Sequence, residues 1–411
     1  MKSLTSTARR PLSGLVVIEA GSLIAASFCG QLLADFGATV IKIEPPKERS
    51  IDTLRQWGRK YKHGEGFLPS ILNRNKKLIT LDLSRPEGIQ VLKKLLIKAD
   101  ALVENFKPGT FASWGLGENE LKNLNEQLIH VAISGFGQNG PMSNLPAFGA
   151  IAEAMGGMRN LIGYPDRPPV RPGVSIGDFL AGLYSAFGLS MALVERNNSK
   201  KGQLVDVAIY ESVMGVMEDL LPMFSFFDIT RGPVGPGFDR FAPSSIFPTK
   251  DGGWVLIAAP TDGPFKKLCH CMERSELITD ERFNTQTLRA DHRLEIDAIV
   301  SQWSMKFETD ELVEILRKGD VPVGKSYTAK DIMSDEHIRY REMVVRVNDE
   351  RFGEIAMQGV VPKMSRTPGE ISHPGGPIGM HTQEIYSEFL NLTKEEIDGL
   401  HRSKVLSLIH I

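Results

Sequence analysis

Two short apolar runs decide the fold, Leu15-Val16-Val17-Ile18-Glu19-Ala20 and Thr39-Val40-Ile41-Lys42-Ile43. Both are rich in β-branched residues and have the length of a buried strand. Between them, residues 27–36 have a helical pattern that ends at Gly37, a residue type that often closes a helix. A strand, a helix and a second strand in this order are typical of a βαβ unit with parallel strands.

The same alternation continues to about residue 210. We expect further strands at residues 78–83, 101–104 and 129–133, and an amphipathic helix at residues 86–99 that begins with a proline. Repeated units of this kind predict an α/β fold with a mostly parallel sheet.

The character of the sequence changes near residue 230, where Arg231-Gly232-Pro233-Val234-Gly235-Pro236-Gly237 indicates a linker. A hairpin pattern at residues 244–259 and charged helical stretches at 263–317 follow, which predicts a smaller α+β domain. The expected parts are a large domain at 1–225 and 340–411, a small domain at 241–320, and linkers at 226–240 and 321–339.

Composition excludes several classes of function. The formal net charge is -2, and there is no basic block that would favour nucleic acid or an anionic membrane as a partner. No run of 18 apolar residues is present, so we expect no membrane-spanning segment.

The three cysteines, Cys29, Cys269 and Cys271, do not suggest disulfides, which favours the cytoplasm or, in a eukaryote, the mitochondrial matrix. Cys269-His270-Cys271 has no matching second pair, so we interpret it as packing and expect no metal.

Gly135-Phe136-Gly137-Gln138-Asn139-Gly140 has the spacing of a dinucleotide-binding loop and follows an expected strand. Such a site also needs a helix that opens at the last glycine and an acidic residue about 20 positions further on. Pro141 and the loop residues after it interrupt that helix. We therefore interpret the run as a glycine-rich turn and expect no tightly bound cofactor.

Asp178 is a candidate for a reactive side chain. It follows Arg171-Pro172-Gly173-Val174 in the first turn of an apolar helix that we expect from about Ser175 to Leu193. An acid at this position can simply cap the helix by accepting hydrogen bonds from free N–H groups. A carboxylate held against a helix rich in glycine and alanine is also partly desolvated, which makes it a better nucleophile. The local sequence leaves both interpretations open.

Two polar segments adjoin the expected strands. In Glu104-Asn105-Phe106-Lys107-Pro108-Gly109-Thr110 a strand ends and a short helix begins, which is where open α/β sheets bind ligands. Lys107 suits a phosphate, and Asn105 and Phe106 offer an amide and an aromatic face for a base or a pantetheine arm. The alternative is an ordinary turn with a solvated lysine. The basic run Asn73-Arg74-Asn75-Lys76-Lys77 likewise suits either a phosphate or solvent.

The chain resembles the class III (family III) CoA-transferases, a family that includes formyl-CoA, carnitine and glutarate CoA-transferases and the α-methylacyl-CoA racemases. The resemblance is best over the first 210 residues and rests on six segments in the order of the family, at residues 11–19, 32–44, 73–77, 104–109, 134–137 and 177–178. It implies a Rossmann-like large domain completed by the C-terminal segment, a smaller α+β domain and an interlaced homodimer. It also implies an acyl-CoA and a carboxylic acid as substrates.

The resemblance makes Asp178 the nucleophile, which attacks the thioester of the donor acyl-CoA and forms a mixed anhydride and then an aspartyl-CoA thioester. An arginine that some members carry is replaced here by Pro45, so Lys42 and Arg74 become further candidates for contacts with the CoA phosphates. The CoA contacts that the resemblance implies are Ala25, Leu81, Asn105, Phe106, Lys107, Ala147, Phe148 and Gly149.

Phe148 distinguishes transfer from racemisation. The racemase branch carries a histidine at this position, followed by an aspartate, and racemisation needs an acid/base group on each face of the α-carbon. Phe148-Gly149 provides neither, which favours CoA transfer over an acyl-CoA racemase or epimerase. A non-catalytic CoA-binding protein is the other alternative. The sequence does not specify the acceptor acid, although Arg55, Arg59 or Arg240 could pair with a second carboxylate.

Overall fold

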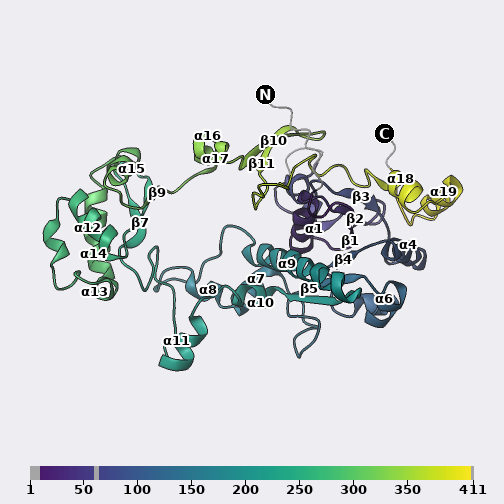
Figure 1. Cartoon of the computed structure of the whole chain (residues 1–411), viewed down its shortest axis with the longest axis horizontal. Coiled ribbons are helices and arrows are strands. Elements are labelled where there is room, and N and C mark those ends of the chain that lie inside the picture. The colour runs from purple at the N-terminus through teal and green to yellow at the C-terminus, as the bar shows by residue number, and fades with distance from the viewer. Residues whose placement is uncertain (1–9, 60–63, 409–411) are drawn as a thin grey trace. The chain divides into compact units, whose positions relative to one another are not determined.

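The computed structural model describes residues 10–59 and 64–408, and Figure 1 shows its helices and strands. Contacts divide the chain into two compact units. The first comprises residues 1–158, 173–218 and 338–411, and the second comprises residues 159–172 and 219–337. The sequence predicts an uninterrupted large-domain segment up to residue 225, whereas residues 159–172 make their contacts within the second unit.

A six-stranded parallel sheet forms the core of the first unit. Its strands are β1 (Val16–Glu19), β2 (Thr39–Glu44), β3 (Lys77–Thr80), β4 (Ala101–Glu104), β5 (Ile129–Ser134) and β6 (Leu204–Ala208). They are ordered β3-β2-β1-β4-β5-β6, and every neighbouring pair is parallel. This confirms the expected α/β class and the parallel sheet.

Helices cover both faces of this sheet. Those of the first unit are α1 (Ala25–Asp35), α2 (Thr53–Gln56), α3 (Leu68–Leu72), α4 (Pro86–Ile97), α5 (Thr110–Ser113), α6 (Glu118–Leu124), α7 (Gly149–Met155), α9 (Ile176–Ser199) and α10 (Ile209–Met214). The neighbours Val17 and Ile18 on β1 point to opposite layers, as alternate residues of a strand do. Val17 packs in the layer that contains α1 and α9, and Ile18 packs in the layer that contains α4 and α6. The short helix α8 (Met158–Leu161) begins at the last residue of this segment of the first unit, and its other residues belong to the second unit.

Helix α9 packs closely along α1 because small residues line its buried face. A β-carbon at Gly182 would lie 2.7 Å from the carbonyl oxygen of Ala25 and 3.0 Å from Cδ1 of Phe28. By length and composition alone, α9 is apolar enough to cross a membrane, with a mean hydropathy of 1.4 over its most apolar window. Core helices of soluble proteins have the same property, so this is weak evidence for a membrane span.

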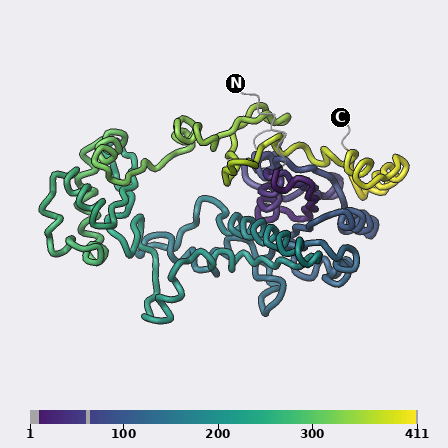
Figure 2. The backbone as a smooth tube through the Cα atoms, in the orientation of Figure 1, coloured from purple at the N-terminus to yellow at the C-terminus, as the bar shows by residue number. Residues whose placement is uncertain are grey.

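The C-terminal segment returns to the sheet of the first unit beside β3, and its path is the yellow part of the chain in Figure 2. The Leu78 N–H donates to Nδ1 of His381 at 3.0 Å, and Thr80 Oγ1 both accepts from and donates to the backbone of Ser407, at 2.9 and 2.7 Å. This segment therefore completes the first unit. Its elements are α17 (Glu336–Tyr340), β10 (Val344–Asp349), β11 (Gly353–Gln358), α18 (Thr382–Glu384), a π-helical turn (Ile385–Phe389) and α19 (Lys394–Arg402).

The second unit has an antiparallel sheet and a hydrophobic core of its own. The sheet confirms the predicted hairpin. The segment at 321–339 that was expected to be a linker contains a strand, a helix and most of a second helix. Cys269 is buried in the core and Cys271 packs against it. Among the described residues, no group of three or more His, Cys, Asp or Glu side chains could hold a metal ion. The elements are α11 (Leu220–Phe227), β7 (Ser244–Pro248), β8 (Trp254–Ala258), α12 (Asp262–Cys271), a 3₁₀ turn (Ser275–Ile278), α13 (Gln286–Asp291), α14 (Arg293–Ser304), α15 (Thr309–Lys318), β9 (Val323–Lys325) and α16 (Ala329–Ser334).

Candidate active site

The carboxyl ends of β1 and β4 lie side by side in the middle of the sheet. The chain proceeds from β1 to β2 and β3 on one side and from β4 to β5 and β6 on the other, so the strand order reverses between β1 and β4. Open α/β sheets bind ligands in the crevice outside the carboxyl ends of the strands at such a point. The predicted CoA contacts Ala25, Asn105, Phe106 and Lys107 lie in or next to the two loops that follow these strands.

Asn105 joins the two loops. Its Oδ1 accepts a hydrogen bond from the Ser22 N–H, and its Nδ2 donates to the Ser22 carbonyl oxygen, both at 2.8 Å. The amide therefore holds the loop after β1, and its expected contact with CoA stays a prediction. The next residue, Leu23, has a φ of 58°, in the left-handed region that costs a non-glycine residue about 1–2 kcal/mol. The sequence gives no signal of this strain.

Asp178 lies in the first turn of α9, and its carboxylate reaches the start of α7. A β-carbon on Gly149, the first residue of α7, would lie 2.8 Å from Cγ and 3.0 Å from Oδ1 of Asp178. The Asp178 side chain is half-buried. Because the first N–H groups of a helix have no partner within it and carry partial positive charge, this place favours an ionised carboxylate. The structure thus brings together two residues that the sequence predicts for the site.

Gly135 and Glu153 support the contact between Asp178 and Gly149. A β-carbon on Gly135 would overlap the β-carbon of Ala147, so the glycine-rich turn packs directly against the segment that precedes Gly149. Glu153 on α7 is fully buried, and its Oε1 accepts a hydrogen bond of 3.3 Å from the Gly177 N–H. Sequence analysis missed Glu153, although a lone acid within an alanine-rich apolar helix was an available signal.

The other predicted CoA contacts differ in exposure. Lys107 is exposed, and Phe148 keeps 64% of its surface. Phe106 is half-buried and packs edge-on against Trp114, with ring centroids 5.1 Å apart. The side chains of Ala25 and Leu81 belong to the hydrophobic core, so only their backbone atoms can meet a ligand. These CoA contacts stay predictions.

The two cations proposed for the CoA phosphates are buried in ion pairs. Lys42 is fully buried, and its Nζ lies 3.0 Å from Oε1 of Glu19. Nη2 of Arg74 lies 2.6 Å from Oδ2 of Asp35, and both side chains are buried. Each cation already faces a buried carboxylate and has almost no surface, which argues against the phosphate role that the sequence suggested for Lys42 and Arg74.

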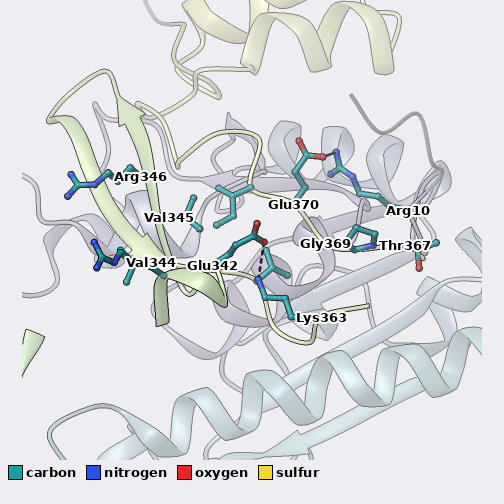
Figure 3. Close-up of a pocket in the computed structure, with 13 residues that line it drawn as sticks. Arg10, Glu342, Val344, Val345, Arg346, Lys363, Thr367, Gly369 and Glu370 are labelled. Atoms are coloured by element: carbon teal, nitrogen blue, oxygen red, sulfur yellow. Dashed lines mark hydrogen bonds and ion pairs between the residues drawn. The ribbon is translucent and has the colours of Figure 1, made fainter. Parts of the chain in front are cut away.

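A pocket of about 550 Å³ lies elsewhere in the first unit, and Figure 3 shows its lining. Arg10 pairs with Glu370 at 2.8 Å, and Lys363 pairs with Glu342 at 3.7 Å. No predicted catalytic or CoA-contact residue lines this pocket, so it gives no argument for the substrate site. Its lining consists of Arg10, Arg339, Glu342, Val344, Val345, Arg346, Val360, Lys363, Thr367, Pro368, Gly369, Glu370 and Ile371.

Comparison with known sequences identifies the family. The sequence model of CoA-transferase family III matches residues 12–382. A succinyl-CoA–D-citramalate CoA-transferase from Chloroflexus aurantiacus is 44% identical over 397 residues, which are 97% of this chain and 98% of that protein. The beta subunit of succinyl-CoA–L-malate CoA-transferase from the same organism is 37% identical over 98% of this chain and 99% of its own length.

A solved structure agrees with these relatives. The crystal structure of a CAIB/BAIF family protein from Brucella suis matches with a TM-score of 0.82 at 30% sequence identity, and covers 92% of this chain and 99% of that one. The parallel sheet and the six ordered sequence segments fit the same family. The chain therefore belongs to CoA-transferase family III and is an enzyme that transfers CoA.

Proposed function

We propose that this enzyme transfers CoA from succinyl-CoA to a hydroxydicarboxylic acid through covalent intermediates on Asp178. The donor and the class of acceptor follow from two relatives, whose names give succinyl-CoA as donor and D-citramalate or L-malate as acceptor. Both acceptors are short dicarboxylic acids with a hydroxyl group. The observation that carries the role of Asp178 is the position of its carboxylate against Gly149, where α7 begins.

Asp178 acts as a nucleophile in this scheme. Its carboxylate attacks the thioester carbonyl of succinyl-CoA and expels the CoA thiolate, which leaves a mixed anhydride. The thiolate attacks the aspartyl carbonyl of that anhydride, succinate leaves, and an aspartyl-CoA thioester remains. The acceptor carboxylate attacks this thioester and forms a second anhydride with release of thiolate. Attack of the thiolate on the acceptor carbonyl then gives the product acyl-CoA and restores Asp178.

The surroundings of Asp178 suit this chemistry. A half-buried carboxylate is less solvated than one in water and so more reactive. Each attack builds negative charge on a carbonyl oxygen, which needs N–H donors or positive dipole ends nearby. The first turns of α7 and α9 supply such dipole ends. Gly149 lets the carboxylate approach α7 because it has no side chain.

A dicarboxylic acceptor needs a cation for its second carboxylate. The sequence suggests three arginines for this role. Arg55 is buried and binds both carboxylate oxygens of Glu44, at 2.6 and 2.9 Å, so we no longer expect it to pair with the acceptor. Arg59 is exposed, and Arg240 is partly exposed and pairs with Asp219 at 2.5 Å. Arg59 and Arg240 are therefore the candidates that we retain.

We also propose that two copies assemble, as the interlaced homodimer implied by the resemblance requires. On α9 the side chains of Leu183, Phe187, Met191 and Val194 keep between 49% and 60% of their surface. They recur every three or four positions and so form one apolar stripe, which in a soluble protein marks an interface. Phe187→Glu should reduce the mass found by light scattering from a dimer to a monomer, whereas Glu195→Gln on the same helix should not. A monomeric wild-type protein would contradict this assembly.

Trapping of the covalent enzyme tests the role of Asp178. Hydroxylamine added to enzyme and succinyl-CoA should convert the activated aspartyl group to a hydroxamate, which peptide mass mapping should locate at Asp178. Asp178→Ala should yield no hydroxamate and should lose transfer by several orders of magnitude, as loss of a covalent nucleophile does. Full transfer by this variant would exclude the mechanism.

A screen of acceptors tests the substrate class. With succinyl-CoA as donor, D-citramalate, L-malate, glutarate, oxalate and acetate are compared by kcat/KM. The two hydroxydicarboxylates should react fastest, because their second carboxylate and hydroxyl both offer binding groups. Equal values for acetate and L-malate would contradict the proposed acceptor class and leave the role of Asp178 untouched.

A further inference from the structure

We propose that Lys42 and Lys76 are positioning residues for CoA transfer, which fix residues 21–27 in the conformation that receives the acyl-CoA. Residues 21–27 comprise the loop after β1 and the first turn of α1, and we call them the β1–α1 segment. The inference rests on the proposed function and adds two side chains that take no part in the chemistry. Both lysines are fully buried, so neither can touch a substrate.

Each ammonium group holds the backbone at one end of the β1–α1 segment. Nζ of Lys42 donates to the carbonyl oxygen of Gly21 and lies 3.4 Å from Oγ of Ser27. Nζ of Lys76 donates to the carbonyl oxygen of Ser27 at 2.8 Å. Ser22 lies between Gly21 and Ser27, and the side chain of Asn105 binds both the N–H and the carbonyl group of Ser22. The segment is thus fixed at its beginning, in its loop and at the start of the helix.

The segment needs such support because its backbone is strained at Leu23. A φ of 58° is unfavourable for leucine, and conformations of this kind persist only where the surrounding structure enforces them. Leu23 lies at the carboxyl edge of the sheet, next to the point where the strand order reverses. Strained backbone of this kind is found most often at functional sites, and this edge of an open α/β sheet is where ligands bind.

Both ammonium groups pair with the same carboxylate. Glu19 lies between them, with Oε1 3.0 Å from Lys42 and Oε2 2.7 Å from Lys76. A β-carbon on Gly30 would lie 3.0 Å from Cδ of Glu19 and 3.2 Å from Nζ of Lys76, so α1 leaves a space for this cluster. Oδ2 of Asp52 is 3.7 Å from Lys42 and adds a second negative charge. The cluster is part of the contact between β1, β2 and α1.

Stability alone gives a weak reason for this arrangement. Buried ion pairs are costly to desolvate, and apolar side chains of similar volume often stabilise a fold equally well. Burial lowers the pKa of Lys76 to about 8 against the opposing charge of Glu19, so the fold bears a cost to keep this amine charged. What an apolar replacement could not do is donate a hydrogen bond to the carbonyl groups of Gly21 and Ser27.

The chain offers a matched control in Arg74, which belongs to the same basic run as Lys76. Its guanidinium is buried and binds Asp35, the last residue of α1, and the carbonyl oxygen of Gln358. Arg74 therefore ties the far end of the same helix by the same kind of ion pair. Loss of Arg74 and loss of Lys76 should destabilise the fold in similar ways, but only Lys76 contacts the β1–α1 segment.

Binding of CoA to Lys76→Met and Arg74→Met tests the proposal directly. Isothermal calorimetry with coenzyme A should show affinity reduced tenfold or more in Lys76→Met and within twofold of the wild type in Arg74→Met. The KM for succinyl-CoA should rise in Lys76→Met and stay near the wild-type value in Arg74→Met, while both variants lose thermal stability. Equal CoA affinity in the wild type and Lys76→Met, with both folded, would overturn the proposal.

A second substitution separates positioning from general destabilisation. Glycine adopts positive φ without strain, so Leu23→Gly should reduce the need for the lysine donors. In the Lys76→Met background, Leu23→Gly should recover part of the lost CoA affinity, whereas in the Arg74→Met background it should have only its own additive effect. Additive effects in both backgrounds would show that Lys76 does not act through the loop.

Two measures keep the outcome interpretable. If Lys76→Met does not fold, the double variant Glu19→Gln/Lys76→Met replaces it in the binding experiment, because it removes both charges of the ion pair. Lys42→Met tests the other lysine donor. The hydroxamate experiment on Asp178 is run on the same proteins. A wild type without a hydroxamate refutes the proposed function, whereas a normal hydroxamate with unchanged CoA affinity in the lysine variants refutes the positioning role alone.

Discussion

The carboxylate of Asp178 lies against the α-carbon of Gly149, so close that a β-carbon on Gly149 would stand 2.8 Å from Cγ of Asp178. The two residues come from the first turns of different helices, α9 and α7. The backbone at the start of α7 therefore limits where this carboxylate can lie. This contact makes the geometry of the candidate nucleophile sensitive to the smallest possible change at residue 149.

Gly149→Ala should therefore impair transfer without unfolding the protein. The added methyl group forces the Asp178 carboxylate to move, and a misplacement of about 1 Å at a reacting group can cost on the order of 100-fold in rate. We expect a loss of this order in kcat with succinyl-CoA and a nearly unchanged thermal transition. Gly263→Ala is the control, because nothing lies within 4 Å of its added β-carbon. Wild-type kcat in Gly149→Ala would show that this contact does not set the reactive geometry.

Asn105→Asp should raise the KM for succinyl-CoA. The aspartate keeps an acceptor for the Ser22 N–H but sets an oxygen against the Ser22 carbonyl, which costs about 1–3 kcal/mol and frees the loop. We expect a rise of roughly tenfold, which is 1.4 kcal/mol. Asn125→Asp is the matched control, since that amide also bridges backbone groups, donating to Leu96 and Ala99. The same rise in KM for both variants would show that general destabilisation, and not release of the loop after β1, causes the effect.

The main strands of the first unit could be predicted because helices cover both of their faces. Parallel strands of this kind appear in the sequence as continuous apolar runs, as Val16-Val17-Ile18 and Val40-Ile41 do. Strand β6 was missed for the opposite reason. It is the edge strand of the sheet, Leu204 is exposed, and Asp206 interrupts the apolar pattern.

The segments of the candidate site could also be found, since each adjoins the end of a strand or the start of a helix. Their supporting contacts could not, because these depend on which strands become neighbours. Glu19 and Lys42 face each other only when β1 and β2 pair in register. A charge inside an otherwise apolar strand was the available signal, because such a residue is buried only with a partner. The φ of Leu23 had no signal in the sequence.

Exposure to deuterated water tests the racemase alternative. Phe148 is exposed and has no group that could exchange a proton with the α-carbon of a substrate. A 2-methylacyl-CoA incubated with the enzyme in D₂O should therefore gain no deuterium at its α-carbon, whereas the same enzyme should transfer CoA from succinyl-CoA to an acceptor. Mass spectrometry of the acyl group makes the measurement, and enzyme-free buffer gives the background. Deuterium incorporation as fast as transfer would favour a racemase.

Asp297→Asn should stabilise the second unit at neutral pH but not in acid. Asp297 lies on α14, 3.7 Å from Arg293, and burial raises the pKa of its carboxyl to about 6 against the opposing charge of that arginine. A raised pKa means that the folded state holds the proton more tightly, so stability falls as pH rises from about 4 to about 6. The ionised form then costs about 1–3 kcal/mol at pH 7.5, and the uncharged amide avoids this cost. Thermal melts at pH 4 and pH 7.5 should show a higher midpoint for Asp297→Asn only at pH 7.5, and the exposed Asp291→Asn should show no such difference. An equal gain at both pH values would mean that ionisation of Asp297 is not its cause.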